Sequence, residues 1–415
     1  MTRATFFVIS FLFLFKPEAG LAQTNEKKMA AGTYGYDFRF LKQHTRKTVE
    51  LKNAQGARVL LSADYQGRVM TSTASGDQGS SFGWINYDLI SSGTIKTQFN
   101  PVGGEERFWL GPEGGQYALY FKKGHPFVIE HWQVPYCIDT VSYLISKTSD
   151  SSVSFSSSAV LQNYSGTIFS IDIHRTVRLY NKQAIEKKLT TTIPADVNFV
   201  AYESSNSIKN NGPTGWQKET GLLSIWLLGM MTPTEQTVAI IPFSPGTNSR
   251  DFINDNYFGT IPADRLMVSD SVLFFLCDGK YRSKLGLSPS IARSIAASFD
   301  FEKNVLTTIH FPVEIEGQYV NSKWEQQEYP YRGDVVNSYN DGPLAGGGQL
   351  GPFYELESSS SAKELNPGEE QNYVQLTCHF QGNYSSMRDL TSQLLHVDLD
   401  KVKGILPKPG SKKLQ

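Results

Sequence analysis

The stretch from Trp324 to Ser358 combines carboxylates, amides, aromatic rings and glycines, with few aliphatic side chains. Its polar side chains offer the hydrogen-bond donors and acceptors that a polyhydroxylated ligand needs. These are Glu325, Asp334, Asn337, Asn340, Asp341 and Glu355. The flat faces of Trp324, Tyr329, Tyr331 and Tyr339 suit the C–H groups of a sugar. The composition therefore indicates a carbohydrate site. The alternative is a long surface loop in which Gly, Asn, Asp and Pro only form turns.

A second polar stretch runs from Gly103 to Phe121, where glycine pairs and a proline surround charged residues and a tryptophan. Arg107 and Trp109 are two residues apart, so in a strand both side chains lie on the same face, where a guanidinium and an indole can hold one ligand. Glu113 is a further candidate ligand contact. From Gln116 to Phe121 the alternation predicts a strand with one face toward a cleft. A loop with ordinary turn residues is the alternative for the whole stretch.

Two histidines and an arginine lie in segments with strand-like alternation. Phe127 to Trp132 predicts a strand in which His131 fits either a catalytic or a structural role. In the hairpin from Ser152 to Tyr180, Arg175 shares a face with apolar residues, so it must be paired or must reach into a cleft. His174 lies on the opposite face as a candidate substrate contact.

Glu355 is the expected general base if the protein acts on a sugar, because it begins a strand directly after the polar stretch. Phe353, Tyr354 and the glycine-rich segment 345–351 can partly desolvate its carboxyl group and raise its pKa. No cofactor is expected, although Asp334, Asp341 and nearby carbonyl groups offer the oxygen ligands that Ca²⁺ prefers.

Many short strands with Gly and Pro at their joints predict an all-β protein built as one large antiparallel double sheet. Hairpins are predicted at Thr48 to Asp64 and at Leu222 to Phe243, beside the one that contains Arg175. One or two short helices are expected, at Ile291 to Ala297 and at Ser385 to Leu399. The absence of a repeat of fixed period argues against a propeller.

Residues 1–22 have the composition of a signal peptide, because a short apolar run is followed by Gly20 and Ala22. A periplasmic or secreted location follows. No later stretch is apolar enough to span a membrane. We expect one domain over residues 35–385, followed by a short helix and a basic, disordered tail over residues 386–415.

Charge and cysteine content narrow the range of partners. The chain has 39 basic and 40 acidic side chains and a net charge of −1, so no basic surface indicates nucleic acid. The three cysteines are widely spaced, which excludes both a disulfide framework and a CxxC metal site but leaves one disulfide possible. The expected partner is a mono- or oligosaccharide. The sequence does not indicate an oligomeric state.

Three segments in this order resemble the galactose mutarotase-like superfamily: TVELKNAQGARVLLSADYQGRVMTST, GGEERFWLGPEGGQ and YELESSSSAKELNPGEE. Within it, the phrase NSKWEQQEYPYRGDVVNSYNDGP resembles an uncharacterised secreted family of the Bacteroidota. The resemblance covers roughly residues 35 to 385. It implies a β-supersandwich with a sugar site on its concave face.

The resemblance implies a reaction less directly than it implies a fold. Aldose 1-epimerases use a late-strand carboxylate as base and a histidine as acid to open the sugar ring. Glu355 matches the carboxylate, with Glu357 next in line. The histidine motifs of that family have no counterpart, and His131 and His174 replace them by position only. Two function classes follow: a carbohydrate-active enzyme, whether epimerase, lyase or hydrolase, and a non-catalytic glycan-binding protein.

Overall fold

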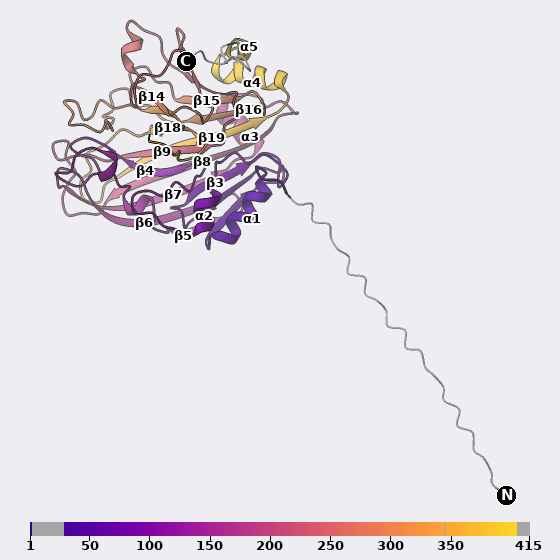
Figure 1. Ribbon diagram of the computed structural model, residues 1–415, viewed down its shortest axis with the longest axis horizontal. Helices are drawn as coiled ribbons and strands as arrows, with labels where there is room; N and C mark the ends of the chain where they lie inside the picture. The colour runs from indigo at the N-terminus through magenta and orange to yellow at the C-terminus, as the bar shows by residue number, and fades with distance from the viewer. Residues whose placement is uncertain (2–28, 345, 405–415) are drawn as a thin grey trace.

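The structure is a computed structural model that describes Met1 and residues 29–344 and 346–404. The strands pair antiparallel and form three sheets, of ten, six and three strands (Figure 1). The expectation of an all-β protein built around a large antiparallel double sheet is confirmed. Apart from Met1, the predicted signal peptide lies outside the described residues.

The ten-stranded sheet has the order β12-β13-β10-β15-β16-β19-β8-β7-β6-β5. Near its middle, β8 and β19 pair along the whole length of β19. The predicted hairpin with Arg175 is confirmed as β6 and β7. The strands are β5 (Leu144–Ser149), β6 (Ser152–Gln162), β7 (Ile168–Leu179), β8 (Asn198–Asn210), β10 (Thr237–Pro242), β12 (Leu266–Val268), β13 (Val272–Leu276), β15 (Ile295–Asp300), β16 (Val305–His310) and β19 (Glu370–Gln381).

The six-stranded sheet has the order β11-β14-β17-β18-β9-β4, so strands far apart in sequence are neighbours in it. They are β4 (Arg107–Gly111), β9 (Ser224–Met231), β11 (Ile253–Asn254), β14 (Ser283–Leu287), β17 (Val336–Asn340) and β18 (Tyr354–Ser359). The three-stranded sheet contains the predicted first hairpin. Its strands are β1 (Thr48–Lys52), β2 (Arg58–Ser62) and β3 (Arg68–Thr73).

The described residues contain more helices than the one or two expected. The predicted C-terminal helix is present as α4, and its cap Asn383 accepts a hydrogen bond from the backbone N–H of Ser386. A further helix, α5, follows within the segment 386–415, where a disordered tail was expected after the first helix. The helices are α1 (Tyr34–His44), α2 (Tyr87–Ser92), α3 (Lys182–Leu189), α4 (Tyr384–Leu395) and α5 (Leu399–Lys403), with short 3-10 turns η1 (Ile129–His131), η2 (Tyr136–Ile138) and η3 (Ser249–Phe252).

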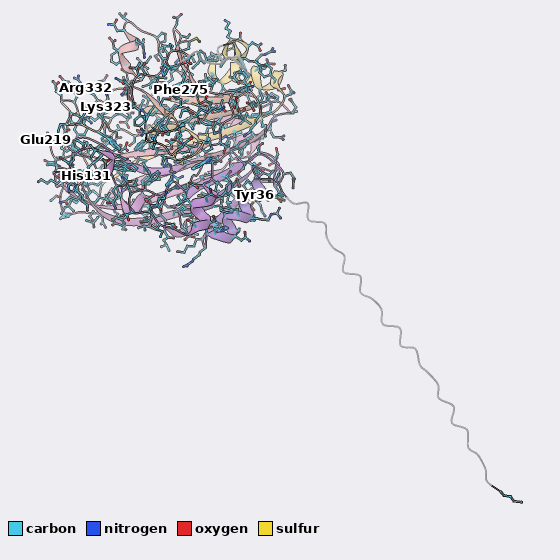
Figure 2. The ribbon with its side chains drawn as sticks, in the orientation of Figure 1. Tyr36, His131, Glu219, Phe275, Lys323 and Arg332 are labelled. Atoms are coloured by element: carbon cyan, nitrogen blue, oxygen red, sulfur yellow. The ribbon has the colours of Figure 1, made fainter. Side chains whose placement is uncertain are left out.

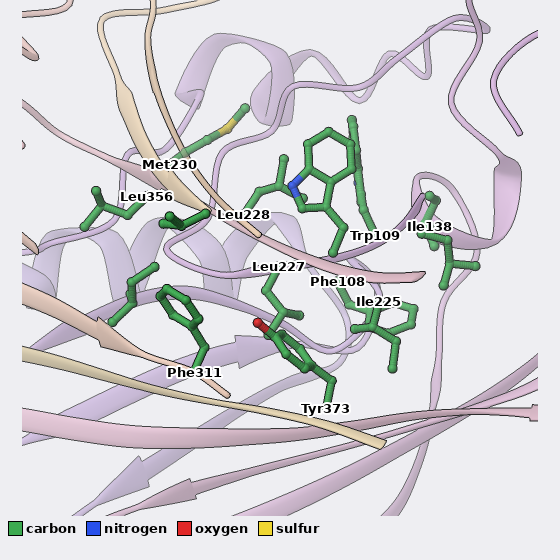
Figure 3. Packing of buried hydrophobic residues seen from close by; sticks show 14 of the residues in the cluster. Phe108, Trp109, Ile138, Ile225, Leu227, Leu228, Met230, Phe311, Leu356 and Tyr373 are labelled. Atoms are coloured by element: carbon green, nitrogen blue, oxygen red, sulfur yellow. The ribbon is translucent and has the colours of Figure 1, made fainter. Parts of the chain in front are cut away.

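The two large sheets pack face to face across one apolar layer. Ile225 and Leu227 of the six-stranded sheet lie toward Tyr373 of β19, whereas Trp109 lies on the other side of its sheet (Figure 3). Because side chains alternate along a strand, the six-stranded sheet has a second face turned away from this layer. The ten-stranded sheet is covered on its own far side by α3, α4 and α5 at one end.

Several predicted elements are wrong, each because tertiary packing overrides the local pattern. Residues 116–121 form turns instead of a strand, since Gly115 has a positive φ and the N–H of Ala118 bonds back to its carbonyl. Residues 127–132 contain η1, and the apolar Val128 and Ile129 are exposed there. The helix predicted at 291–297 is replaced by β15, which is paired on both sides.

The hairpin predicted from Leu222 to Phe243 is also wrong. Its strands exist as β9 and β10, but they belong to different sheets. The connection between them therefore crosses from one layer of the sandwich to the other. The three cysteines are free and buried, so no disulfide links the layers.

Arg175 lies in the layer between the sheets and is fully buried. Its guanidinium donates to the carbonyl of Gly67 at 3.0 Å, to Asn206 Oδ1 at 2.6 Å and to Glu106 Oε1 at 2.6 Å. Of the two roles open to Arg175, the structure shows the paired one.

Replacing Arg175 by Ala should lower the free energy of unfolding by about 3–5 kcal/mol, because it leaves the Glu106 carboxylate buried without its partner. Urea denaturation measures the change. Arg178→Ala, on the exposed face of the same strand, is the matched control and should change stability by about 0.5 kcal/mol or less. Equal effects of the two substitutions would contradict the structural role of the Arg175–Glu106 pair.

Candidate functional site

The candidate site lies on the face of the six-stranded sheet that is turned away from the ten-stranded sheet. Strand register places Lys284 opposite Tyr339, Tyr339 opposite Glu355, and Asn337 opposite Glu357. Side chains that pair directly across strands point to the same face. The polar residues of β14, β17 and β18 therefore form one surface, which β9 and β4 extend through Trp226, Arg107 and Trp109.

Arg107 and Glu355 form a buried pair between the guanidinium Nη2 and the carboxyl Oε1, which is an ion pair whenever Glu355 is deprotonated. The residues are 2% and 5% exposed. The guanidinium carbon also lies 4.6 Å from the ring centre of Trp109, as the spacing of Arg107 and Trp109 predicts. Among the described residues, Arg107 Nε and Nη1 and Trp109 Nε1 have no hydrogen-bond partner. These nitrogens are therefore available as hydrogen-bond donors.

Lys284 and Glu357 form a second buried ion pair beside the first. The Lys284 ammonium lies 2.8 Å from Glu357 Oε2, and Trp226 Nε1 donates to the same oxygen at 3.0 Å. The ammonium also lies 4.8 Å from the Trp226 ring centre. The other carboxylate oxygen, Oε1, is buried and has no partner in the described part of the chain. The same face of the sheet thus carries a buried acceptor and buried donors that have no hydrogen-bond partner among the described residues.

Glu113 reaches this surface from the loop that follows β4. Its carboxylate accepts a hydrogen bond from Trp132 Nε1 at 2.9 Å, and its backbone N–H donates to Ser322 Oγ at 3.1 Å. The ring of Trp132 stacks on Trp324 with centres 6.0 Å apart. Trp324, from the opening polar stretch, is thereby joined to the loop after β4.

Burial raises the pKa of two carboxyl groups at this surface into the neutral range. Burial raises the pKa of Glu355 to about 8, although the charge of Arg107 opposes the shift; the neighbouring Glu357 adds to it. Burial likewise raises the pKa of Glu113 to about 7, against the opposing charge of Lys284. Carboxyl groups with such values can both give and take a proton near neutral pH.

Asp334 and Asn337 flank the surface on the side of β14. The Tyr257 hydroxyl donates to Asp334 Oδ2 at 2.5 Å, and Asn337 Nδ2 donates to the Tyr257 oxygen at 3.2 Å. Asp334 lies directly over Gly286, where a Cβ atom would meet its Oδ2 at 2.1 Å. Burial raises the pKa of Asp334, and the charge of Lys284 opposes that shift.

Asp341 and Asn340 lie at the far end of β17. Asp341 accepts from the Tyr339 hydroxyl at 2.6 Å and from the Gly351 N–H at 3.0 Å. Asn340 points to the opposite face and bonds to Asp278 Oδ1 and to the Tyr281 carbonyl. Asp334 precedes β17 and Asp341 follows it, which separates them by roughly 20 Å at about 3.3 Å per residue. Their two carboxylates therefore cannot bind the same Ca²⁺ ion.

The structure does not bring five predicted site residues to this surface: Arg175, buried between the sheets, Asn340, on the opposite face of β17, and His131, His174 and Glu325. His131 is exposed and its Nδ1 lies 3.0 Å from His125 Nδ1. His174 is exposed on the outer face of β7, because it alternates with the buried Arg175. Glu325 is exposed, although its neighbour Trp324 packs inward. His131 lies with Lys323, Arg332 and Glu219 at the end of the molecule remote from Tyr36 (Figure 2).

Lys284 and Trp226 belong to the surface but were not among the predicted site residues, and Glu357 was predicted only as the alternative to Glu355 as the base. Lys284 could have been found, since Arg282 and Lys284 share a face with Gly286 in a short alternating strand. Glu357 shares a face with Glu355. Trp226 carries no such signal, because β9 is apolar throughout and buried on both sides.

Sequence comparison identifies a family. Residues 32–406 match a family of unknown function, DUF6786. The chain belongs to this family. No curated protein matches the sequence.

Several solved structures are similar at low identity. The Slr1438 protein from Synechocystis sp. PCC 6803 is 12% identical, with 81% of this chain and 97% of that chain covered and a TM-score of 0.49. A putative aldose 1-epimerase from Escherichia coli K12 is 9% identical, with 81% and 100% covered and a TM-score of 0.48. A galactose mutarotase-like protein from Lactobacillus casei ATCC 334 is 11% identical, with 80% and 100% covered and a TM-score of 0.46. Likeness at this level carries no conclusion about activity.

Membrane-spanning helices and metal-binding groups were sought among the residues that the structure describes. No helix among them has both the length and the apolar composition needed to cross a membrane. They also contain no group of three or more His, Cys, Asp or Glu side chains placed to hold a metal ion.

The raised pKa of Glu355 should make stability depend on pH. Between the ordinary value of 4.5 and about 8, the folded protein keeps a proton that the unfolded chain has released. Its stabilising contribution is therefore complete below pH 4.5 and is lost as the pH rises to about 8. In Glu355→Gln this contribution disappears, so the stability difference between wild type and variant should change across that window.

Urea denaturation of both proteins at a series of pH values measures this difference. Glu328→Gln, an exposed residue of the 312–335 loop, makes the same chemical change without burial and should leave the pH dependence of the wild type intact. A pH-independent difference between wild type and Glu355→Gln would contradict the raised pKa.

Proposed function

We propose that a mono- or oligosaccharide binds to the face of the six-stranded sheet that is turned away from the ten-stranded sheet. We further propose that the protein acts on this sugar as an aldose 1-epimerase-like enzyme of the galactose mutarotase-like superfamily. One observation supports this proposal most strongly: the ion pairs Arg107–Glu355 and Lys284–Glu357 lie on the same face of the sheet. On that face Glu357 Oε1 can still accept a hydrogen bond, and nitrogens of Arg107 and Trp109 can still donate one. The resemblance of the sequence to the superfamily supports it.

The proposed chemistry is reversible opening of the sugar ring. One carboxylate removes the proton of the C1 hydroxyl, a second group gives a proton to the ring oxygen, and the bond between C1 and that oxygen breaks as the C1 carbonyl forms. The chain then rotates about the bond between C1 and C2, and the ring oxygen attacks the other face of the C1 carbonyl. Ring closure returns both protons. Glu355 is the proposed group at the C1 hydroxyl. The free Arg107 donors are suited to the oxygen that gains negative charge.

Sugar binding at Glu355 requires a movement of the loop that includes Tyr257 and Phe258. Glu355 and Glu357 are almost closed to solvent. The Tyr257 ring centre lies 5.6 Å from the Lys284 ammonium, and Phe258 packs on Arg282 at 3.7 Å and edge-on against Tyr339. Phe258 is 44% exposed, so the loop that carries Tyr257 and Phe258 has one side in solvent. Loop opening of this kind is common where a reaction must exclude water.

A second candidate function is glycan binding without turnover. The unpaired indole N–H of Trp109 and the stacked rings of Trp132 and Trp324 favour it, because they recognise a sugar without changing it. A lyase or hydrolase activity would use the same carboxyl groups. In each case we propose action in the periplasm or outside the cell, on the composition of residues 1–22.

Glu355→Gln should lower the rate of anomer exchange about 10²- to 10⁴-fold while sugar binding persists, because Gln keeps the shape of the side chain but cannot accept the proton. The purified protein is incubated with D-galactose, D-glucose and D-glucuronic acid. Anomer exchange is followed by NMR, and unsaturated products are followed by absorbance.

Glu328→Gln is the control and should retain the wild-type rate. Full activity of Glu355→Gln would make Glu355 a structural acceptor and refute its catalytic role. Binding without exchange or cleavage in the wild type would favour the glycan-binding function.

A further inference from the structure

Ring opening needs two proton-transfer groups, and Glu355 supplies only one. Glu357 is poorly suited to be the second, because Lys284 and Trp226 already donate to one of its oxygens. The chain has seven histidines, all in the described part of the structure, and none contacts the site. They lie in exposed positions, at element ends or between the two large sheets: His44, His125, His131, His174, His310, His379 and His396.

Two further carboxyl groups lie near Lys284: Asp334, which accepts from the Tyr257 hydroxyl, and the half-buried Glu113, which also faces Glu357. The charge of Lys284 attracts the Glu113 carboxylate and the charge of Glu357 repels it, and the same two charges act on Glu355. The two carboxyl groups come from different places, since Glu355 belongs to β18 and Glu113 to the loop after β4. Trp132 Nε1 fixes the position of the Glu113 carboxyl group at 2.9 Å.

We propose that Glu113 is the second catalytic residue and exchanges the proton of the sugar ring oxygen while Glu355 serves the C1 hydroxyl. This inference rests on the proposed function. In the opening step, Glu113 gives its proton to the ring oxygen as the bond to C1 breaks and Glu355 takes the C1 hydroxyl proton. In the closing step both protons return, so no other reactant is needed.

The surroundings of Glu113 suit a group that changes protonation during the reaction. Its raised pKa, about 7, keeps both protonation states accessible at neutral pH. The titratable and charged groups that face it are Lys284, Glu357 and the buried Tyr120 phenol. Its Trp132 partner is a donor only, so it stabilises the carboxylate without competing for the proton.

The test compares the pH profile of anomer exchange in wild type and Glu113→Gln. In the wild type, the pH profile of the rate should have one limb near pH 7, set by the titration of Glu113, and a second limb near pH 8, set by Glu355. The variant should lose the limb near pH 7 and be about 10²- to 10⁴-fold slower. Gln keeps an oxygen that can accept from the Trp132 indole, so near-UV circular dichroism and sugar affinity should stay at wild-type values.

Glu328→Gln serves again as the control for the chemical change. A Glu113→Gln variant with the full rate, or with a reduced rate and an unchanged limb near pH 7, would overturn the role of Glu113 while leaving the proposed function intact. A wild type that exchanges the anomers of none of the sugars would refute the proposed function, and this inference with it.

Discussion

The ion pair between Lys284 and Glu357 is the interaction on which the candidate site depends. Lys284 reaches across β17 from β14 to β18, and its charge acts on Glu113, Asp334 and Glu355 as well as on Glu357. Several carboxyl groups buried together would otherwise repel one another. Loss of one partner of such a pair leaves the other charge buried at a cost of about 3–5 kcal/mol. The same cation therefore reduces the repulsion among these carboxyl groups and opposes the rise in their pKa that burial causes.

Strand register is the second constraint, because it decides which charges meet in which layer. Glu106 and Arg107 are adjacent, yet Glu106 pairs with Arg175 between the sheets whereas Arg107 pairs with Glu355 on the opposite face of the six-stranded sheet. A slip of one residue would exchange these faces and leave both pairs broken. The buried Arg175–Glu106 pair thus helps to hold Arg107 in its place at the site.

The sequence predicted the local parts of this arrangement well. Alternation found the hairpin strands β1, β2, β6 and β7, and the spacing of Arg107 and Trp109 correctly placed both on one face of β4. Local patterns failed where the partner of a segment decides its structure. Residues 291–297 have a helical start signal but form β15 because β10 and β16 pair with it. Val128 and Ile129 suggested a strand although no sheet edge covers them.

The assembly of the site could not be predicted, because it follows from the strand order β14-β17-β18-β9-β4. That order places Lys284 near Glu357 and brings Arg107 to Glu355 across a sequence separation of 248 residues. Composition marked the stretch from Trp324 to Ser358 as a site, but β17 divides it, so Asp334 and Asp341 lie at opposite ends. Alternation of side chains also could not decide between the two roles open to Arg175. Only the sheet packing shows that its face meets Glu106.

A crystal structure of the protein soaked with D-galactose tests the central claim most directly. The account predicts a sugar whose C1 hydroxyl lies within hydrogen-bonding distance of Glu355 and whose oxygens accept from the free nitrogens of Arg107, with Tyr257 and Phe258 displaced. A sugar bound only elsewhere, such as on the outer face of β7 near His174, with the Arg107–Glu355 and Lys284–Glu357 pairs unchanged, would contradict it.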